Sequence, residues 1–120
     1  MKVLVTDPLS RVGIQLFQET PDMEVDVRTG IDAGELKDII HNYEGLVIRS
    51  ATRVTADILA SARKLRVIGR AGIGLDNVDI AEASRRGIVV MNTPEGNTIT
   101  TAEHTMAMMM AISRNIPQAT

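Results

Sequence analysis

Short apolar runs alternate along the chain with longer segments in which apolar residues recur every three or four positions. The short runs are rich in valine, isoleucine and leucine, and they lie at residues 3–5, 25–27, 46–48, 67–68 and 88–91. Runs of this length and composition favour β-strands that are covered on both faces of a parallel sheet. The alternation therefore predicts successive strand–helix units.

The segments between these runs carry the spacing and the end signals of helices. Ser10 and Asp32 each precede an apolar face with helical spacing and are suited to cap a helix start, and Gly87 is suited to follow a helix end. The two faces consist of residues 9, 12, 16 and 17 and of residues 36, 39, 40 and 43. Further helices are predicted at about residues 55–62, 78–86 and 98–115. Thr100 and Glu103 are expected to form a capping box in the last one.

Together these elements predict an α/β fold with a flavodoxin-like, three-layer arrangement. A five-stranded parallel sheet in the order 2-1-3-4-5 would carry helices on both faces. The chain divides into two parts at this stage. Residues 1–97 are expected to form the sheet domain, and residues 98–120 are expected to form a helix that leads out of it.

Composition excludes several classes of function. The 120 residues include no cysteine, which rules out disulfides, thiolate metal sites and cysteine nucleophiles. His41 and His104 are too far apart to suggest a local metal motif, so no metal is expected. The formal net charge of −2 argues against a nucleic-acid partner. No apolar run is long enough for a membrane span and no signal peptide is evident, so a soluble, cytoplasmic protein without a membrane partner is expected.

Candidate chemistry lies at the carboxyl ends of the predicted strands, where open α/β sheets bind ligands. Arg49 and Ser50 follow the third strand, Gly72-Ile73-Gly74 follows the fourth, and Asn97 ends the segment after the fifth. Arginine offers a planar fork that matches carboxylate and phosphate oxygens, and glycines let backbone N–H groups approach an anion closely. We therefore expect a small anionic ligand. Ordinary polar loops with exposed arginines are the alternative.

Three other ligand classes fit the residues less well. Gly72-Ile73-Gly74-Leu75-Asp76-Asn77 lies between a strand and a helix like a dinucleotide fingerprint, but Asn77 replaces the third glycine. A phospho-accepting receiver domain would need an aspartate where Arg49 stands. A flavin site needs aromatic rings, and Phe17 and Tyr43 both fall on the predicted core faces of helices.

Three motifs make the sequence similar to a known family. They are Val47-Ile48-Arg49-Ser50-Ala51-Thr52-Arg53-Val54-Thr55, Gly69-Arg70-Ala71-Gly72-Ile73-Gly74-Leu75-Asp76-Asn77-Val78-Asp79, and Val90-Met91-Asn92-Thr93-Pro94-Glu95-Gly96-Asn97 followed by Thr101-Ala102-Glu103-His104. In this order and spacing they resemble the D-isomer-specific 2-hydroxyacid dehydrogenases, in particular the branch that oxidises 3-phospho-D-glycerate. The resemblance covers the whole chain.

The resemblance implies roles for individual residues. Arg49 and Ser50 match residues that hold the substrate phosphate or carboxylate, and Asn97 matches a substrate-contacting asparagine. The loop Gly72-Ile73-Gly74 matches one that offers backbone N–H groups to the substrate carboxylate. Ile73 and Thr101 match positions that contact the nicotinamide end of NAD.

The resemblance also implies a division of labour. Family members join a flavodoxin-like substrate domain, split in sequence, to an inserted NAD-binding Rossmann domain. The NAD fingerprint and the catalytic arginine, glutamate and histidine are then expected beyond residue 120, so this chain is expected to hold no catalytic residue and to bind NAD weakly at most. His104 belongs to the interdomain helix in this interpretation.

The expected function is therefore the substrate-binding portion of an oxidoreductase. The parent enzyme would oxidise 3-phospho-D-glycerate to 3-phosphohydroxypyruvate with NAD, and this portion would be inactive alone. Two alternatives stay open: a stand-alone module that binds a small phosphorylated or 2-hydroxy acid, and a part of a sister D-2-hydroxyacid dehydrogenase.

The last predicted helix carries an expectation of its own. Residues 105–112 contain no charge over more than two helical turns. A helix that is apolar nearly all round requires burial on several sides. We therefore expect self-association, as a dimer built on residues 98–116.

Overall fold

The computed structural model describes residues 1–119 and contains a five-stranded parallel sheet in the order β2-β1-β3-β4-β5. The strands are β1 (Lys2–Val5), β2 (Glu24–Val27), β3 (Gly45–Ile48), β4 (Val67–Arg70) and β5 (Val89–Met91). The predicted flavodoxin-like strand order is confirmed. All carboxyl ends of the strands consequently lie at the same edge of the sheet.

Helices follow the strands in chain order. They are α1 (Arg11–Glu19), α2 (Ala33–Ile39), the 3-10 helix η1 (Ile40–Asn42), α3 (Ala56–Ser61), α4 (Ile80–Arg85), α5 (Thr98–Ser113) and α6 (Ile116–Ala119). The predicted caps Ser10 and Asp32 are confirmed, because each side chain accepts a backbone N–H from three residues further along. Gly87 follows α4 with a φ of 72°, the left-handed conformation that glycine adopts without strain.

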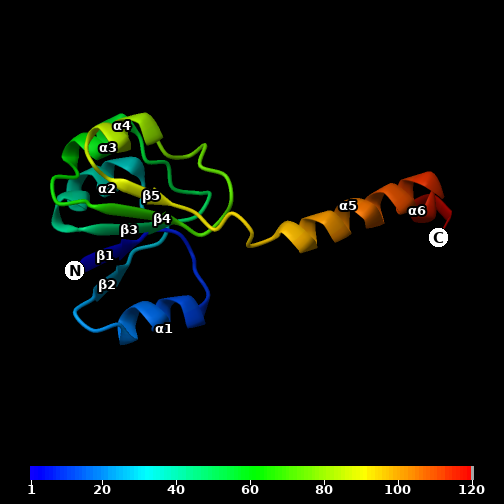
Figure 1. Cartoon of the computed structure of the whole chain (residues 1–120), viewed down its shortest axis with the longest axis horizontal. Helices are drawn as coiled ribbons and strands as arrows, with labels where there is room; N and C mark the ends of the chain where they lie inside the picture. The colour runs from blue at the N-terminus through cyan, green and yellow to red at the C-terminus, as the bar shows by residue number, and fades with distance from the viewer. Residues whose placement is uncertain (120) are drawn as a thin grey trace.

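Figure 1 shows α2, α3 and α4 on one side of the sheet and α1 on the other, which gives the three predicted layers. The hydrophobic core involves α2–α4 and the sheet face toward them. Its largest enclosed side chains are those of Leu4, Ile40, Leu46, Ile48, Ile58, Leu59 and Ile68. This side of the domain closes its own core and holds the strands in register.

One of the two predicted core faces differs from the structure, and the other is confirmed. The α1 side chains Val12 and Leu16 are 68% and 63% exposed, although their spacing predicted burial. Among the strands, helix α1 packs mainly against the edge strand β2, so it covers one edge of its sheet face and leaves its own apolar residues open. On the other side, Leu36 and Tyr43 are buried as their spacing predicted, although α2 ends at Ile39 and Tyr43 follows the short helix η1.

Helix α5 leaves the sheet domain altogether (Figure 1). Its contacts with other elements are to α6, and the molecule measures 56 × 32 × 24 Å as a result. The predicted capping box is wrong: α5 begins at Thr98 after Asn97, so Thr100 already lies inside the helix. The segment 98–120 is also not one helix, since α5 ends at Ser113 and α6 follows a turn, while Thr120 lies outside the described residues. Within residues 1–119, no helix has the length and apolarity that crossing a membrane requires.

Candidate functional site

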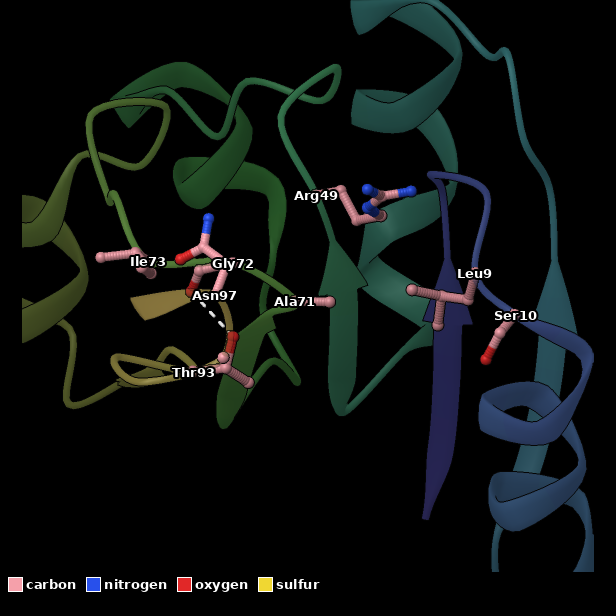
Figure 2. Close-up of a pocket in the computed structure, with 9 residues that line it drawn as sticks. Leu9, Ser10, Arg49, Ala71, Gly72, Ile73, Thr93 and Asn97 are labelled. Carbon is pink, nitrogen blue, oxygen red and sulfur yellow. Dashed lines mark hydrogen bonds between the residues drawn. The ribbon is translucent and has the colours of Figure 1, made fainter. Parts of the chain in front are cut away.

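A cavity of about 530 Å³ lies at the carboxyl edge of the sheet, between the segments that follow β1, β3, β4 and β5. Its lining residues are Leu9, Ser10, Arg49, Ala71, Gly72, Ile73, Thr93, Gly96 and Asn97. Figure 2 shows Arg49 between Leu9 and Ser10 on one side and Ala71 and Gly72 on the other. Four of the predicted site residues, Arg49, Gly72, Ile73 and Asn97, therefore meet at one cavity.

Ser50, Gly74 and Thr101 do not line this cavity. Ser50 and Gly74 are exposed and stand next to lining residues in the chain. Thr101 lies in the first turn of α5, where its backbone N–H donates to the carbonyl of Asn97 over 2.9 Å. The roles predicted for these three residues stay predictions.

Arg49 supplies the positive charge of the cavity. Its side chain is exposed, and its Nη1 donates to the carbonyl of Pro8 over 3.3 Å. Among residues 1–119, Arg49 forms no ion pair with a carboxylate. The guanidinium therefore keeps most of its donors for an anion that enters the cavity.

The loop of Gly72, Ile73 and Gly74 is held by the segment after β5. Thr93 donates its backbone N–H to the carbonyl of Gly72 over 2.9 Å, and the Asn92 amide donates to the carbonyl of Ile73 over 2.8 Å. In a trans peptide the N–H points opposite to the preceding carbonyl. The N–H groups of Ile73 and Gly74 are therefore turned away from the β5 segment, as the donors of an anion-binding loop must be.

The Arg70 side chain lies close to the glycine loop. A Cβ added at Gly72 would stand 2.6 Å from Nη1 of Arg70, the far end of a flexible side chain. The Nε of Arg70 donates to the carbonyl of Arg49 over 3.3 Å. Arg70 thus links the two loops that border the cavity, and it was absent from the residues predicted for the site.

Asp7, at the end of β1, was also missed. It is 3% exposed and accepts the backbone N–H of Arg49 over 2.7 Å and that of Thr52 over 3.0 Å on one oxygen. The hydroxyl of Thr52 donates to its other oxygen over 2.7 Å. Burial opposes the ionisation of Asp7, but these hydrogen bonds outweigh it and hold the pKa of the carboxyl below its usual value.

Asn77 was interpreted only as a defect in a dinucleotide fingerprint, yet it is a structural member of the site. It is buried, and its Nδ2 donates to the carbonyls of Arg49 and Thr52, over 2.7 Å in both cases. The sequence carries no local signal for this role, because Asn77 stands between Asp76 and Val78 in a polar loop and its partners lie 28 and 25 residues away in the chain.

The described residues do not fit a complete dinucleotide site. Helix α4 begins at Ile80, so several residues separate the glycine loop from the helix N-terminus that would face a pyrophosphate. Ile73 is 42% exposed and offers only an apolar surface to one end of a cofactor. No group of three or more metal-ligating side chains occurs among the residues described either.

Comparison with known proteins matches residues 3–119 to the model of the "D-isomer specific 2-hydroxyacid dehydrogenase, catalytic domain" family. D-3-phosphoglycerate dehydrogenase of Synechocystis is 50% identical over 98% of this chain, and the human enzyme of that name is 46% identical over 99%. The chain covers 21% and 22% of these two proteins, so it spans about a fifth of their length.

Two solved structures are also similar to this chain in sequence and in fold. The TT0316 protein of Thermus thermophilus is 32% identical with a TM-score of 0.86, over 99% of this chain and 39% of its own. The NAD⁺-bound 3-phosphoglycerate dehydrogenase of Entamoeba histolytica is 30% identical with a TM-score of 0.80, over 92% of this chain and 38% of its own. Because the first overlay spans nearly the whole chain, it includes α5 in its extended position.

Proposed function

Because the chain belongs to the D-isomer specific 2-hydroxyacid dehydrogenase family, we propose that it is the substrate-binding portion of an NAD-dependent oxidoreductase. The proposed reaction is the oxidation of 3-phospho-D-glycerate to 3-phosphohydroxypyruvate, the entry to serine biosynthesis. The observation that carries the proposal is the cavity at the carboxyl edge of the sheet, where Arg49 lacks a carboxylate partner among residues 1–119 and faces a loop with outward N–H groups.

The substrate carries two anionic groups, and two sets of donors lie in the cavity or in the loop residues next to it. Arg49 and Ser50 form one set, in which a guanidinium and a hydroxyl suit a phosphate or a carboxylate. The backbone N–H groups of Ile73 and Gly74 form the other, and Asn97 adds a side-chain amide at the rim. Binding at both ends would fix the carbon that bears the hydroxyl group, which is the orientation that a hydride transfer requires.

NAD, when bound, supplies the hydride acceptor of the proposed reaction. Ile73 and Thr101 are the residues of this chain that we place against its nicotinamide end. The chain provides no set of groups for the rest of the cofactor within residues 1–119, so we expect it to bind substrate without turning it over. Its contribution is to bind and orient the acid and to shape one wall of the cleft.

Replacing Arg49 with alanine tests this function. We expect affinity for 3-phosphoglycerate to fall by about 1.5–3 kcal/mol, because a charge-assisted hydrogen bond to an anion is lost. Titration followed by nuclear magnetic resonance suits the weak binding expected of half a cleft. Arg63→Ala is the matched control, since Arg63 is an exposed arginine outside the cavity.

Equal dissociation constants for the Arg49 and Arg63 variants would contradict the proposal. Parallel titrations with lactate and with inorganic phosphate identify the substrate class. Tighter binding of lactate would instead indicate a sister dehydrogenase. Binding of phosphate as tight as that of 3-phosphoglycerate would reduce the site to a phosphate-binding module.

We further propose that a second copy of this chain pairs with α5. Residues 105–112 are uncharged and exposed apart from the half-buried Ala111, and α5 contacts no strand of its own domain. Glu103 in α5 and Arg114, which directly follows the helix, are eleven residues apart, which is about three turns, so they lie close to one face. Ala107 and Met110 lie between them on that face.

An antiparallel pair of α5 helices centred between Met108 and Met109 matches these charges. At both ends Glu103 of one copy would stand opposite the partner's Arg114, and neither residue has an ion-pair partner within residues 1–119. The uncharged segment would fill the middle of the contact. A symmetric dimer of this kind buries the same surface on both copies.

A further inference from the structure

The loop of residues 49–52, which follows β3, is held from two opposite sides by buried polar side chains. Asp7 accepts the backbone N–H groups of Arg49 and Thr52, and Asn77 donates to the carbonyls of the same two residues. Both ends of the loop are therefore fixed through both of their backbone polar groups. Neither Asp7 nor Asn77 lines the cavity.

The orientation of the Asn77 amide is unambiguous. Both of its close neighbours are carbonyl oxygens, which only accept hydrogen bonds, so the donating Nδ2 must face them. The amide oxygen on the opposite side is buried and has no partner among the described residues. An unpaired buried oxygen destabilises the fold. The Asn77 side chain therefore lowers the stability of the fold through its unpaired oxygen, while its Nδ2 holds two loop carbonyls at once.

The hydrogen bonds to the Arg49 carbonyl also fix the direction of the Ser50 N–H. In a trans peptide the N–H of Ser50 points opposite to the carbonyl of Arg49. Because Asn77 and Arg70 draw that carbonyl inward, the N–H of Ser50 is turned outward. It meets no acceptor within residues 1–119, and Ser50 itself is exposed.

Asn77 belongs to the same connection as the glycine loop, three residues after Gly74. Its own carbonyl accepts the N–H of Val54 over 2.8 Å, and Val54 forms a bridge with Val78. The segment that supplies the N–H groups of Ile73 and Gly74 is thereby fastened to the loop that supplies Arg49 and Ser50. The distance between the two sets of donors depends on this connection.

We propose that Asn77 and Asp7 are positioning residues of the substrate site, which hold the 49–52 loop so that Arg49 and Ser50 stand at a fixed distance from the glycine loop. This inference rests on the proposed function, because it assigns the two residues to the same anion site. They act through the loop and do not touch the substrate.

Asn77→Ala tests the proposal in the 120-residue chain. It removes both donated hydrogen bonds and the unpaired oxygen without burying a charge. We expect the affinity for 3-phosphoglycerate to fall about tenfold, since a small misplacement of binding groups has a large effect. Amide hydrogen exchange at Arg49 and Thr52 should become faster in the same variant, because the loop opens more often.

Two comparisons separate positioning from general stability. Tyr43→Phe removes a partly buried hydrogen bond of 2.7 Å, from the Tyr43 hydroxyl to Asp26, and should leave the affinity within threefold of wild type. Asp7→Asn retains an oxygen acceptor for the loop N–H groups and should bind nearly as well as wild type, whereas Asp7→Ala should lose about tenfold. If Asn77→Ala does not fold, the difference in affinity between Asp7→Asn and Asp7→Ala tests the positioning role instead.

The result that overturns the proposal is a folded Asn77→Ala chain with wild-type affinity, or Asp7→Ala and Asp7→Asn chains that bind equally well. A wild-type chain that binds 3-phosphoglycerate no better than its Arg49→Ala variant would instead remove the proposed function. In that case amide exchange still tests whether Asn77 holds the 49–52 loop. Unchanged protection at Arg49 and Thr52 in Asn77→Ala would show that it does not, and lost protection would show that it does.

Discussion

The two sides of the sheet differ in how completely they bury apolar side chains. On the side of α2–α4, leucine and isoleucine side chains are enclosed completely, and Leu59 is 0% exposed. On the side of α1, a cavity of about 440 Å³ lies over the sheet, lined by Phe17, Val47, Gly69 and Met91 among others. Val47, Gly69 and Met91 are neighbours across β3, β4 and β5, so this is an open face of the sheet.

The difference shows that the helical spacing of apolar residues predicts which face of a helix favours burial. It does not predict whether another element of the domain covers that face. Helix α1 has the spacing of a core helix, as α3 does, yet its side is covered by one helix where the other side has three. Helix α5 extends this difference to a whole element, because nearly all of its apolar surface is exposed. Stability should therefore be concentrated on the side of α2–α4.

The largest expected effect comes from truncating one leucine on each side. Leu59→Ala should lower the free energy of unfolding by about 2–5 kcal/mol, because it leaves a cavity in a closed core. Leu16→Ala should change it by less than about 0.5 kcal/mol, because Leu16 is 63% exposed. Urea unfolding of the two variants measures both values. Equal losses would mean that α1 is packed as tightly as α3 in solution.

A second prediction concerns the pH dependence of stability that arises from Tyr43, on the side of α2–α4. Burial and the hydrogen bond to Asp26 raise the pKa of the Tyr43 phenol to about 12. The unfolded chain releases this proton near pH 10, so the stabilisation is complete below pH 10 and is lost as the pH rises toward 12. The loss should amount to about 2–3 kcal/mol.

Unfolding experiments between pH 8 and pH 12 on wild type and Tyr43→Phe isolate this group from the lysines, which titrate in the same range. The variant should be less stable than wild type at pH 8, and the two curves should approach each other above pH 10. Parallel curves over the whole range would show that the phenol ionises normally in the folded chain.

Local signals account for the parts of this structure that the sequence predicts well. Strand runs and the caps Ser10 and Asp32 are encoded within a few residues, and the strand ends then place Arg49 and Gly72 at one edge. The roles of Asp7 and Asn77 depend on hydrogen bonds to a loop 42 and 28 residues away, which no local pattern contains. The burial of α1 was mispredicted because it depends on what else covers the sheet.

The smallest expected effect on folding, and the sharpest test of α5, is Met110→Lys. Met110 is exposed and lies in a helix that leaves the sheet domain, so the free energy of unfolding of the monomer should change by less than about 0.5 kcal/mol. The same charge on the paired face, near its centre, would place two lysines close together in an apolar contact, where neither has a carboxylate partner. Sedimentation at rising concentration should show a dimer for wild type and a monomer for Met110→Lys, and Glu103→Arg should weaken the dimer by setting like charges opposite each other. Restoration of the dimer in Glu103→Arg combined with Arg114→Glu would support the antiparallel arrangement, and a wild-type chain that stays monomeric at high concentration would reject it.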